Sequence, residues 1–181
     1  MLVLSPRAVE RLESYSPTNR PLPKIFRMVK KGKVDQALFK GATINTPSMV
    51  CVEDYLDALQ WADSIGGLEA LIARSRANLE AVEAAVDAYP WLNFLAVDPS
   101  TRSNTSVCLT VDMEAKKLKE MIGWLEDQEV AFDIGAYRDA PDGLRVWCGA
   151  TVETADIELL MEWLNFAYQK FSNDTEEALT A

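Results

Sequence analysis

The hydrophobic period of the chain changes at Pro90, and this change limits the possible folds more than any other feature. Between residues 48 and 89, apolar side chains recur every three or four positions, which predicts two helices separated at Gly66-Gly67. Beyond Pro90 the period falls toward two, which is typical of short strands buried on one face. The later part of the chain is therefore predicted to be a mixed lobe of strands and helices.

This lobe is predicted to repeat the order strand, strand, helix twice. The strands are expected at 93–97, 105–111, 130–136 and 143–148, and the helices at 113–127 and from Thr154, which is expected to cap the last one. Strands short enough for hairpins favour a mainly antiparallel sheet with helices on one face. The five tryptophans are interpreted as core side chains. The predicted fold class is α/β, with an α+β arrangement in the C-terminal lobe.

The start of the chain has a different character. Residues 1–4 are apolar and predict a strand, and Ser5-Pro6 predicts the N-cap and first residue of a helix. Over 15–48, prolines interrupt any period and lysines flank Gly32, so a long irregular connection is expected. Connections of this length are uncommon inside compact domains and are often functional, so this segment is a candidate for binding.

Composition excludes several classes of function. The chain has 18 Lys and Arg against 28 Asp and Glu, a formal net charge of -10, so neither nucleic acid nor a membrane surface is an expected partner. It has no histidine, which excludes Ser-His and Cys-His nucleophile pairs, and no metal site is predicted. Cys51, Cys108 and Cys148 form no C-x-x-C pair and are interpreted as reduced core thiols. Neither a signal peptide nor a membrane-spanning run is found, so a cytoplasmic location is expected.

Arginines on or beside predicted strands are the candidate binding groups. Arg102 precedes a strand, Arg138 lies in a turn, and Arg145 lies between Leu144 and Val146. A buried guanidinium needs a partner, because an unpaired buried charge is strongly unfavourable. That partner is either a carboxylate of this chain or the carboxylate or phosphate of a ligand, which the planar donors of arginine suit well. Arg138 and Arg145, on the two sides of one turn, could converge on a single anion.

A second candidate is the segment 43–48, Thr-Ile-Asn-Thr-Pro-Ser, directly before a predicted helix. Hydroxyl and amide groups beside the free N–H groups of a helix N-terminus can bind phosphate. The same residue types also form ordinary helix caps that bind no ligand. The pattern alone leaves both interpretations open.

Five runs of sequence carry a resemblance to a known family. They are MLVLSPRAVERLESY, RPLPKIFRMVKKGK, GATINTPSMVCVEDYLDALQWADSIGGLEALIARS, RSNTSVCL and GLRVWCGATVE. From residue 1 to about 171, the chain resembles phosphoserine aminotransferases of bacteria and methanogens. The resemblance implies the C-terminal part of a pyridoxal-phosphate enzyme of fold type I. Residues 1–90 would be a remnant of the large cofactor-binding lobe, 91–172 the small lobe and 173–181 a flexible tail.

The resemblance also implies roles for individual residues. Asn45 and Thr46 would contact the pyridoxal 5'-phosphate of the partner subunit in a homodimer. Arg145 would bind the α-carboxylate of the substrate, and Arg138 would bind its phosphate. Tyr137 stands where the family usually has histidine, so it could donate a hydrogen bond but would bring no charge.

The Schiff-base lysine of the family is expected upstream of Met1. The chain would then miss the N-terminal half, hold no catalytic residue and be inactive alone. The whole enzyme would transfer the amino group of glutamate to 3-phosphohydroxypyruvate, giving phosphoserine in serine biosynthesis, with pyridoxal phosphate as cofactor. The alternative is a free-standing, non-catalytic α/β module for protein interaction or anion sensing.

Overall fold

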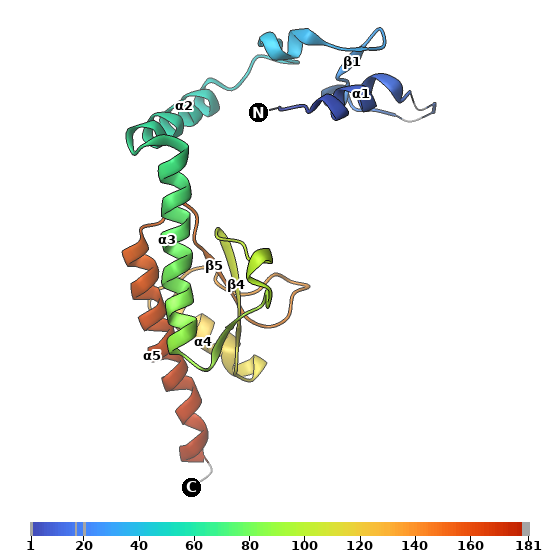
Figure 1. Cartoon of the computed structure of the whole chain (residues 1–181). Helices are drawn as coiled ribbons and strands as arrows, with labels where there is room; N and C mark the ends of the chain where they lie inside the picture. Colours follow the sequence, from blue (N-terminus) through green and yellow to red (C-terminus); the bar gives the residue numbers. More distant parts are fainter. Residues whose placement is uncertain (1, 17, 20, 179–181) are drawn as a thin grey trace. The chain divides into compact units, whose positions relative to one another are not determined.

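The computed structural model describes residues 2–16, 18–19 and 21–178. The chain divides into two compact units, Met1–Leu59 and Gln60–Ala181. Figure 1 shows the order of the helices and strands along the chain. The first unit contains short elements, and the second contains a three-stranded sheet with helices packed on it.

Helix α1 (Pro6–Ser14) begins as the sequence predicts. The Ser5 side chain accepts a hydrogen bond from the Ala8 N–H at 3.1 Å, and Pro6 supplies a fixed φ that suits the first helical position. The strand predicted at 1–4 is wrong over residues 2–4, which pair with no strand of the described chain. Met1 lies outside the described residues.

The segment 15–48 holds more local structure than predicted. It contains 3-10 turns at Lys24–Phe26 and Gln36–Lys40, and between them the strands β1 (Val29–Lys30) and β2 (Lys33–Val34). These strands form an antiparallel hairpin. Lys31 and Gly32 turn the hairpin with φ angles of 54° and 74°, because a tight two-residue turn needs left-handed backbone.

Glu13 ties α1 to this hairpin. Its two carboxylate oxygens accept from Lys33 Nζ at 2.8 Å and from the Val34 N–H at 3.0 Å. Val34 is the one hydrophobic side chain of this unit that is buried, among the residues that the structure describes. The order of the first unit therefore depends strongly on polar contacts near its surface.

The two helices predicted before Pro90 are confirmed. Helix α2 (Met49–Ser64) and helix α3 (Gly67–Ala88) are separated by Gly66 and Gly67, whose φ angles of 112° and 68° favour glycine. Helix α3 ends at Ala88, and its C-cap Tyr89 directly precedes Pro90. No residue of α2 is buried, although the helix carries apolar side chains along its length.

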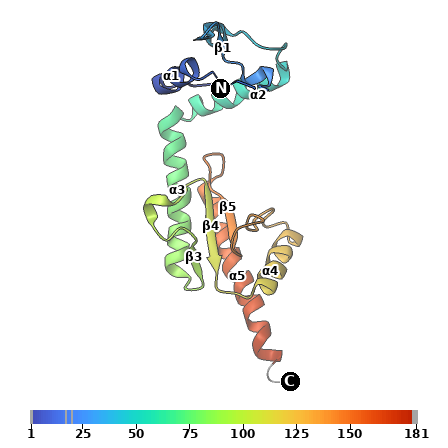
Figure 2. The same ribbon diagram turned by 90° about the vertical axis from the view of Figure 1, so that its right-hand side faces the viewer.

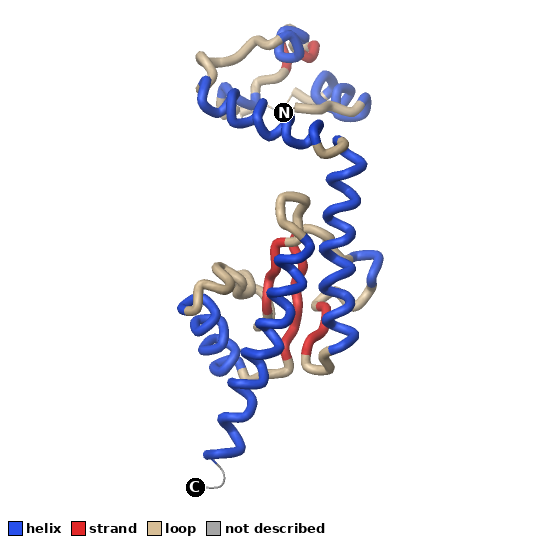
Figure 3. Tube along the Cα trace, turned by 90° about the vertical axis from the view of Figure 1, so that its left-hand side faces the viewer, coloured by secondary structure: helices blue, strands red, loops and turns tan. Residues whose placement is uncertain are grey.

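The antiparallel sheet of the second unit is also confirmed. Strands β3 (Leu92–Phe94), β4 (Ser106–Val111) and β5 (Leu144–Trp147) lie in the order β3-β4-β5, and both pairs are antiparallel (Figure 2). Helices α3 and α5 (Thr154–Ala178) run side by side over one face of the sheet (Figure 3). Helix α4 (Ala115–Asp127) packs against α5. None of the helices α3, α4 and α5 covers the opposite face of the sheet.

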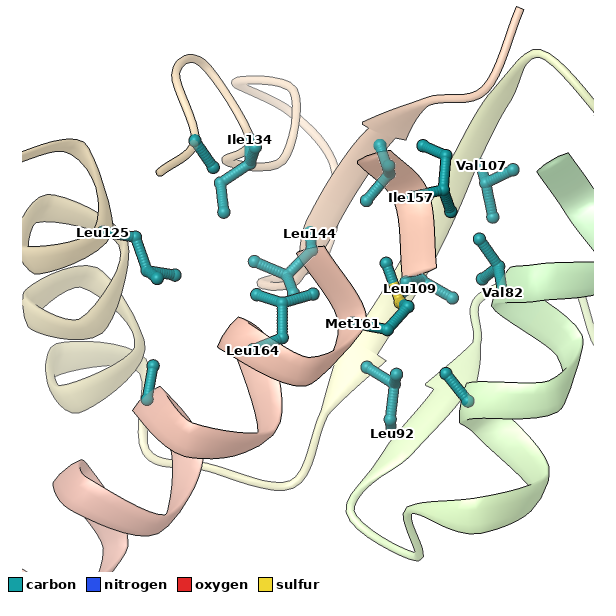
Figure 4. Packing of buried hydrophobic residues seen from close by; sticks show 14 of the residues in the cluster. Val82, Leu92, Val107, Leu109, Leu125, Ile134, Leu144, Ile157, Met161 and Leu164 are labelled. Atoms are coloured by element: carbon teal, nitrogen blue, oxygen red, sulfur yellow. The ribbon is translucent and has the colours of Figure 1, made fainter. Parts of the chain in front are cut away.

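The core of the second unit lies between the sheet and its helices (Figure 4). Along β4 and β5 alternate residues are buried, and the register places Val107 opposite Val146 and Leu109 opposite Leu144. The helices contribute Val82, Leu118, Met121, Leu125, Ile157, Met161 and Leu164. Full burial of one such side chain contributes about 1.5–3 kcal/mol, so this cluster is the main stabilising feature of the unit.

The strand predicted at 130–136 is wrong. This segment forms only an isolated bridge between Gly135 and Leu144, with the Arg145 N–H donating to the Ile134 carbonyl at 2.8 Å. The cause is the left-handed backbone of Asp133, with φ of 54°, because that conformation interrupts an extended strand. Helix α5 continues to Ala178 and so includes part of the segment 173–181 that is predicted to be a flexible tail; residues 179–181 lie outside the described ones.

The tryptophans are only partly in the core. Trp91 is buried, and its ring stacks on Tyr168 with centroids 4.2 Å apart. Trp147 is 55% exposed, because side chains alternate along β5 and its neighbour Val146 takes the buried position. Trp61 and Trp163 are exposed as well, so the core prediction is wrong for these three residues.

Asn78 of α3 is a fully buried polar side chain with a complete set of partners. Its Nδ2 lies 3.1–3.3 Å from the carbonyl oxygens of Cys148, Gly149 and Val152, and its Oδ1 accepts from the Thr154 hydroxyl at 2.7 Å. The hydroxyl of Thr154, which the sequence predicts as a cap, is thus bonded to α3. One turn earlier on α3, Arg74 Nε donates to the Ala150 carbonyl at 2.7 Å. Together these bonds fix the connection between β5 and α5 on α3.

Replacement of Asn78 by alanine should destabilise the second unit. Asn78→Ala removes the amide bonds to three carbonyl groups and leaves the Cys148 carbonyl and the Thr154 hydroxyl without the partner they have in Asn78, so we expect the free energy of unfolding to fall by about 2–4 kcal/mol. Urea unfolding followed by tryptophan fluorescence measures this, because all five tryptophans lie in this unit. The control Asn93→Ala, at an exposed position of β3, should change stability by less than about 0.5 kcal/mol. Equal effects of the two substitutions would contradict the role given to Asn78.

The contact between α1 and the hairpin should weaken in acid. The hydrogen bond from Lys33 and then that from the Val34 amide lower the pKa of Glu13 below its ordinary value of 4.5. The contribution of Glu13 is therefore present above pH 4.5 and is lost as the pH falls through the lower folded-state pKa. Hydrogen exchange should show protection of the Val34 amide at neutral pH that decreases in acid. Glu13→Gln should reduce this protection at neutral pH, whereas Glu10→Gln on the same helix should leave it unchanged.

Candidate functional site

Strand β5 places Arg145 on the face of the sheet opposite the helices. Its neighbours Leu144 and Val146 are buried in the core, so the side chain of Arg145 points to the other face, where Cys108 is its partner on β4. Gly143, directly before β5, lies very close to the backbone of β4 at Leu109. A Cβ at that position would lie 2.2 Å from the Leu109 carbonyl oxygen, so only glycine fits there. This close approach holds the turn before β5 against β4.

Arg145 has a carboxylate partner in its own chain, as a half-buried guanidinium requires. Its Nη2 donates to Asp133 Oδ2 at 2.8 Å and to the Asp133 carbonyl oxygen at 3.2 Å. The Tyr137 ring centroid lies 4.5 Å from the guanidinium carbon. The side chain of Arg145 is 20% exposed, but that of Asp133 is 89% exposed. A largely covered cation is thus paired with a carboxylate that remains in water.

Two features define the electrostatic state of Arg145. The hydrogen bond to Asp133 raises the pKa of the guanidinium further above its ordinary value, and partial burial opposes this shift. The group is therefore a permanent cation. Its Nε is buried and has no hydrogen-bond partner among the described residues. One edge of the guanidinium thus keeps an unused donor.

Arg138 and Tyr137 lie at the wall of a hollow beside α4. Its volume is about 640 Å³, and it lies between α4 and the turn 135–143, with Lys116 and Lys119 of α4 also at its wall. Arg145 borders a different hollow of about 300 Å³, together with Asp133, Trp147 and Asp156. A gap of only about 10 Å³ is lined by both Tyr137 and Arg145. Arg138 and Arg145 thus line separate hollows, and Tyr137 lines the hollow of Arg138 and the small gap beside Arg145.

Arg102 fits the internal ion-pair interpretation. Its Nη1 lies 3.5 Å from Glu83 Oε1 on α3, and its Nε donates to the Ala96 carbonyl at 3.1 Å. The guanidinium carbon also lies 4.0 Å from the centroid of the Phe94 ring. These contacts join the loop after β3 to α3, so the role of Arg102 is structural.

Asn45 and Thr46 lie in the first unit, shortly before α2. Both are exposed, and Ser48 supplies the weak cap of the helix, its Oγ accepting from the Cys51 N–H at 3.5 Å. The amide of Asn45 and the hydroxyl of Thr46 are donors beside the N-terminus of a 16-residue helix. That arrangement is chemically suited to a phosphate group.

Sequence reasoning missed Asp133 as a site residue. It correctly required a carboxylate for Arg145, but it treated 130–136 as a regular strand. A polar Asp inside an otherwise apolar run was the available signal, because Asp and Asn are the side chains that most readily accept left-handed backbone apart from glycine.

Comparison with known proteins adds independent information. No family model matches the chain. Over 168 residues, 93% of this chain, it is 57% identical to proteins named phosphoserine aminotransferase from Methanosarcina mazei and Methanosarcina barkeri. A protein of the same name from Corynebacterium glutamicum is 26% identical over 171 residues. The chain spans about 45% of the length of the two Methanosarcina relatives.

Solved structures support the fold. The phosphoserine aminotransferase from Bacillus circulans subsp. alkalophilus has a TM-score of 0.69 at 22% identity, over 89% of this chain and 42% of its own. A second structure, of radiation damage of the Schiff base in phosphoserine aminotransferase, has a TM-score of 0.67 at 16% identity, over 80% of this chain and 40% of its own. No described helix is long and apolar enough to cross a membrane.

The three cysteines have different environments. Cys148 is buried, as predicted, Cys108 is half-buried beside Arg145 on the open face of the sheet, and Cys51 is exposed on α2. The core prediction is therefore wrong for Cys51. Burial raises the pKa of the Cys148 thiol to about 11.

Alkylation should separate these thiols. At pH 8 a thiol with a pKa of about 11 is ionised to only about one part in a thousand, so Cys148 should react with iodoacetamide only when the second unit unfolds. Cys51 should react first. Mass spectrometry of peptides at successive times measures the order. Modification of Cys148 in the folded chain as fast as that of Cys51 would contradict the buried position of Cys148.

Proposed function

The chain is homologous to phosphoserine aminotransferases, and we propose that it forms the C-terminal part of such an enzyme. The whole enzyme would transfer the amino group of glutamate to 3-phosphohydroxypyruvate, giving phosphoserine and 2-oxoglutarate. One observation carries the proposal within this chain: Arg145 is a largely covered cation whose carboxylate partner is almost fully exposed and whose Nε donor is unused. Such a cation is suited to a ligand carboxylate.

Arg145 would bind the α-carboxylate that all substrates of the reaction share. The Nε and Nη2 groups of a guanidinium form one edge that can donate two parallel hydrogen bonds to a carboxylate. Strand β5 and the Ile134 carbonyl fix the backbone of Arg145, so the edge has a defined direction. Its role would be orientation of the substrate, since a bound carboxylate fixes the position of the neighbouring α-carbon.

Arg138 and Tyr137 would bind the phosphate that distinguishes phosphoserine from glutamate. Arg138 is exposed at the wall of the 640 Å³ hollow, where Lys116 and Lys119 add positive charge. Tyr137 would add a hydroxyl donor without charge. Separate arginines for the two anionic groups would let one site accept both phosphoserine and glutamate.

Asn45 and Thr46 would hold the phosphate of pyridoxal 5'-phosphate bound to a partner subunit. Their exposure and their place before α2 fit a phosphate acceptor. When bound, this cofactor supplies an electron sink for chemistry at the α-carbon of an amino acid. We assign the Schiff-base lysine to the part of the relatives' length that this chain does not span.

The proposed partners are that remaining part and a second subunit. The apolar side chains of α2 support this, because a helix with no buried residue that exposes Met49, Val50, Tyr55 and Leu56 is suited to contact with another protein surface. A cytoplasmic location is part of the same proposal.

A chimaera tests the function. The chain is joined to the preceding part of the Methanosarcina mazei relative, and transamination between glutamate and 3-phosphohydroxypyruvate is assayed. We expect activity in the chimaera and none in the 181-residue chain alone. Arg145→Ala should lower kcat/KM for glutamate and phosphoserine alike, by about 100-fold, because two charged hydrogen bonds are lost. Arg138→Ala should lower kcat/KM about tenfold or more for phosphoserine and much less for glutamate.

Arg76→Ala, at an exposed position of α3, is the matched control and should leave both values unchanged. Equal losses for the two substrates in Arg138→Ala would contradict its assignment to the phosphate. An inactive chimaera, together with specific anion binding by the chain alone, would favour the non-catalytic module.

A further inference from the structure

We propose that the side chain of Asp133 occupies the place of the substrate carboxylate on Arg145 and leaves when substrate binds. Asp133 would then be a built-in competitor that sets the affinity of the site for carboxylates. The inference rests on the proposed function of Arg145.

The contact has the chemistry of the ligand that it would replace. A single carboxylate oxygen of Asp133 lies 2.8 Å from Arg145 Nη2. The aspartate therefore uses only one donor of the guanidinium edge, and the Nε beside it has no partner among the described residues. Because Nε is buried while Asp133 is in place, a substrate carboxylate has to replace the Asp133 side chain to reach it. A carboxylate that then used both Nε and Nη2 would gain one charged hydrogen bond over Asp133.

Displacement of Asp133 is physically easy. Its side chain is 89% exposed, so the carboxylate returns to water without a desolvation penalty. Ion pairs with an exposed partner contribute little to stability. Asp133 can thus be replaced by a ligand carboxylate that has a better geometry.

Departure of the side chain need not release Arg145. The carbonyl oxygen of Asp133 also accepts from Nη2, at 3.2 Å, and the Tyr137 ring lies against the guanidinium. The backbone N–H of Arg145 stays bonded to the Ile134 carbonyl. These contacts keep the guanidinium in place while its carboxylate partner is exchanged.

The competition has a consequence for selectivity. Without a ligand, Asp133 neutralises Arg145, so a single weakly held anion gains little by displacing it. A ligand with a second anionic group gains additional binding energy elsewhere and can displace it. Asp133 would therefore favour substrates with two anionic groups over simple monocarboxylates.

Binding to the 181-residue chain tests the proposal. The Nε–H resonance of Arg145 is followed by NMR on ¹⁵N-labelled protein during titration with L-phosphoserine and, separately, with L-glutamate. Asp133→Asn removes the charge but keeps the left-handed backbone, which Asn accepts readily, and Asp133→Gly removes the side chain with the same backbone tolerance. Asp139→Asn removes an equal charge at an exposed position of the nearby turn and is the control.

We expect both Asp133 variants to bind the two ligands up to about fivefold more tightly than the parent chain, and Asp139→Asn to bind them like the parent. Unchanged or weaker binding in both Asp133 variants, with the Nε–H signal still responding to ligand, would overturn the competition and leave the role of Arg145 intact. A signal that responds to neither ligand in any variant would refute the carboxylate role of Arg145 itself, and the inference with it.

Discussion

The second unit depends on the bonds that α3 makes to the connection between β5 and α5. Asn78 has no exposed surface, and its amide donates to the carbonyl groups of Cys148, Gly149 and Val152. Arg74 continues the same set of bonds one turn earlier on the helix. Hydrophobic packing alone tolerates small shifts of a helix over a sheet, whereas these directional bonds define one position. The connection that follows β5 takes its position from this constraint.

The candidate site forms where regular structure stops. Beside β5, the chain approaches as a fourth strand would, but the left-handed backbone at Asp133 limits the pairing to one bridge. The same irregularity places a carboxylate next to Arg145 and leaves Tyr137 and Arg138 on an exposed turn. A regular strand would have satisfied this edge with backbone pairing and would have removed these side chains from the site. Irregular backbone supported by a rigid sheet is a common basis for ligand recognition.

Much of the fold was predictable because the signals are local. The Ser5-Pro6 start of α1 and the Gly66-Gly67 stop after α2 follow from the backbone preferences of those residues. The antiparallel sheet with helices on one face follows from the hydrophobic period. The prediction of a strand at 130–136 was wrong because a hydrophobic pattern does not reveal one residue with left-handed backbone. The prediction that Trp147 and Cys51 are buried was wrong for another reason: apolar character leads to burial only when some part of the chain covers that face. For the site, the need of Arg145 for a carboxylate partner was predictable from charge burial. Which residue supplies that carboxylate could be seen only from the three-dimensional contacts.

The scarcity of buried side chains in the first unit bears on how it acquires its order. Among the residues of this unit that the structure describes, one buried valine, the polar bonds of Glu13 and a short hairpin provide little to offset the conformational entropy of so many residues. Segments of this kind gain most of their stability upon association, when apolar residues such as those of α2 are sheltered from water. The affinity of such an association is lowered by the ordering it must bring about. Docking and folding of the first unit would then be a single thermodynamic event.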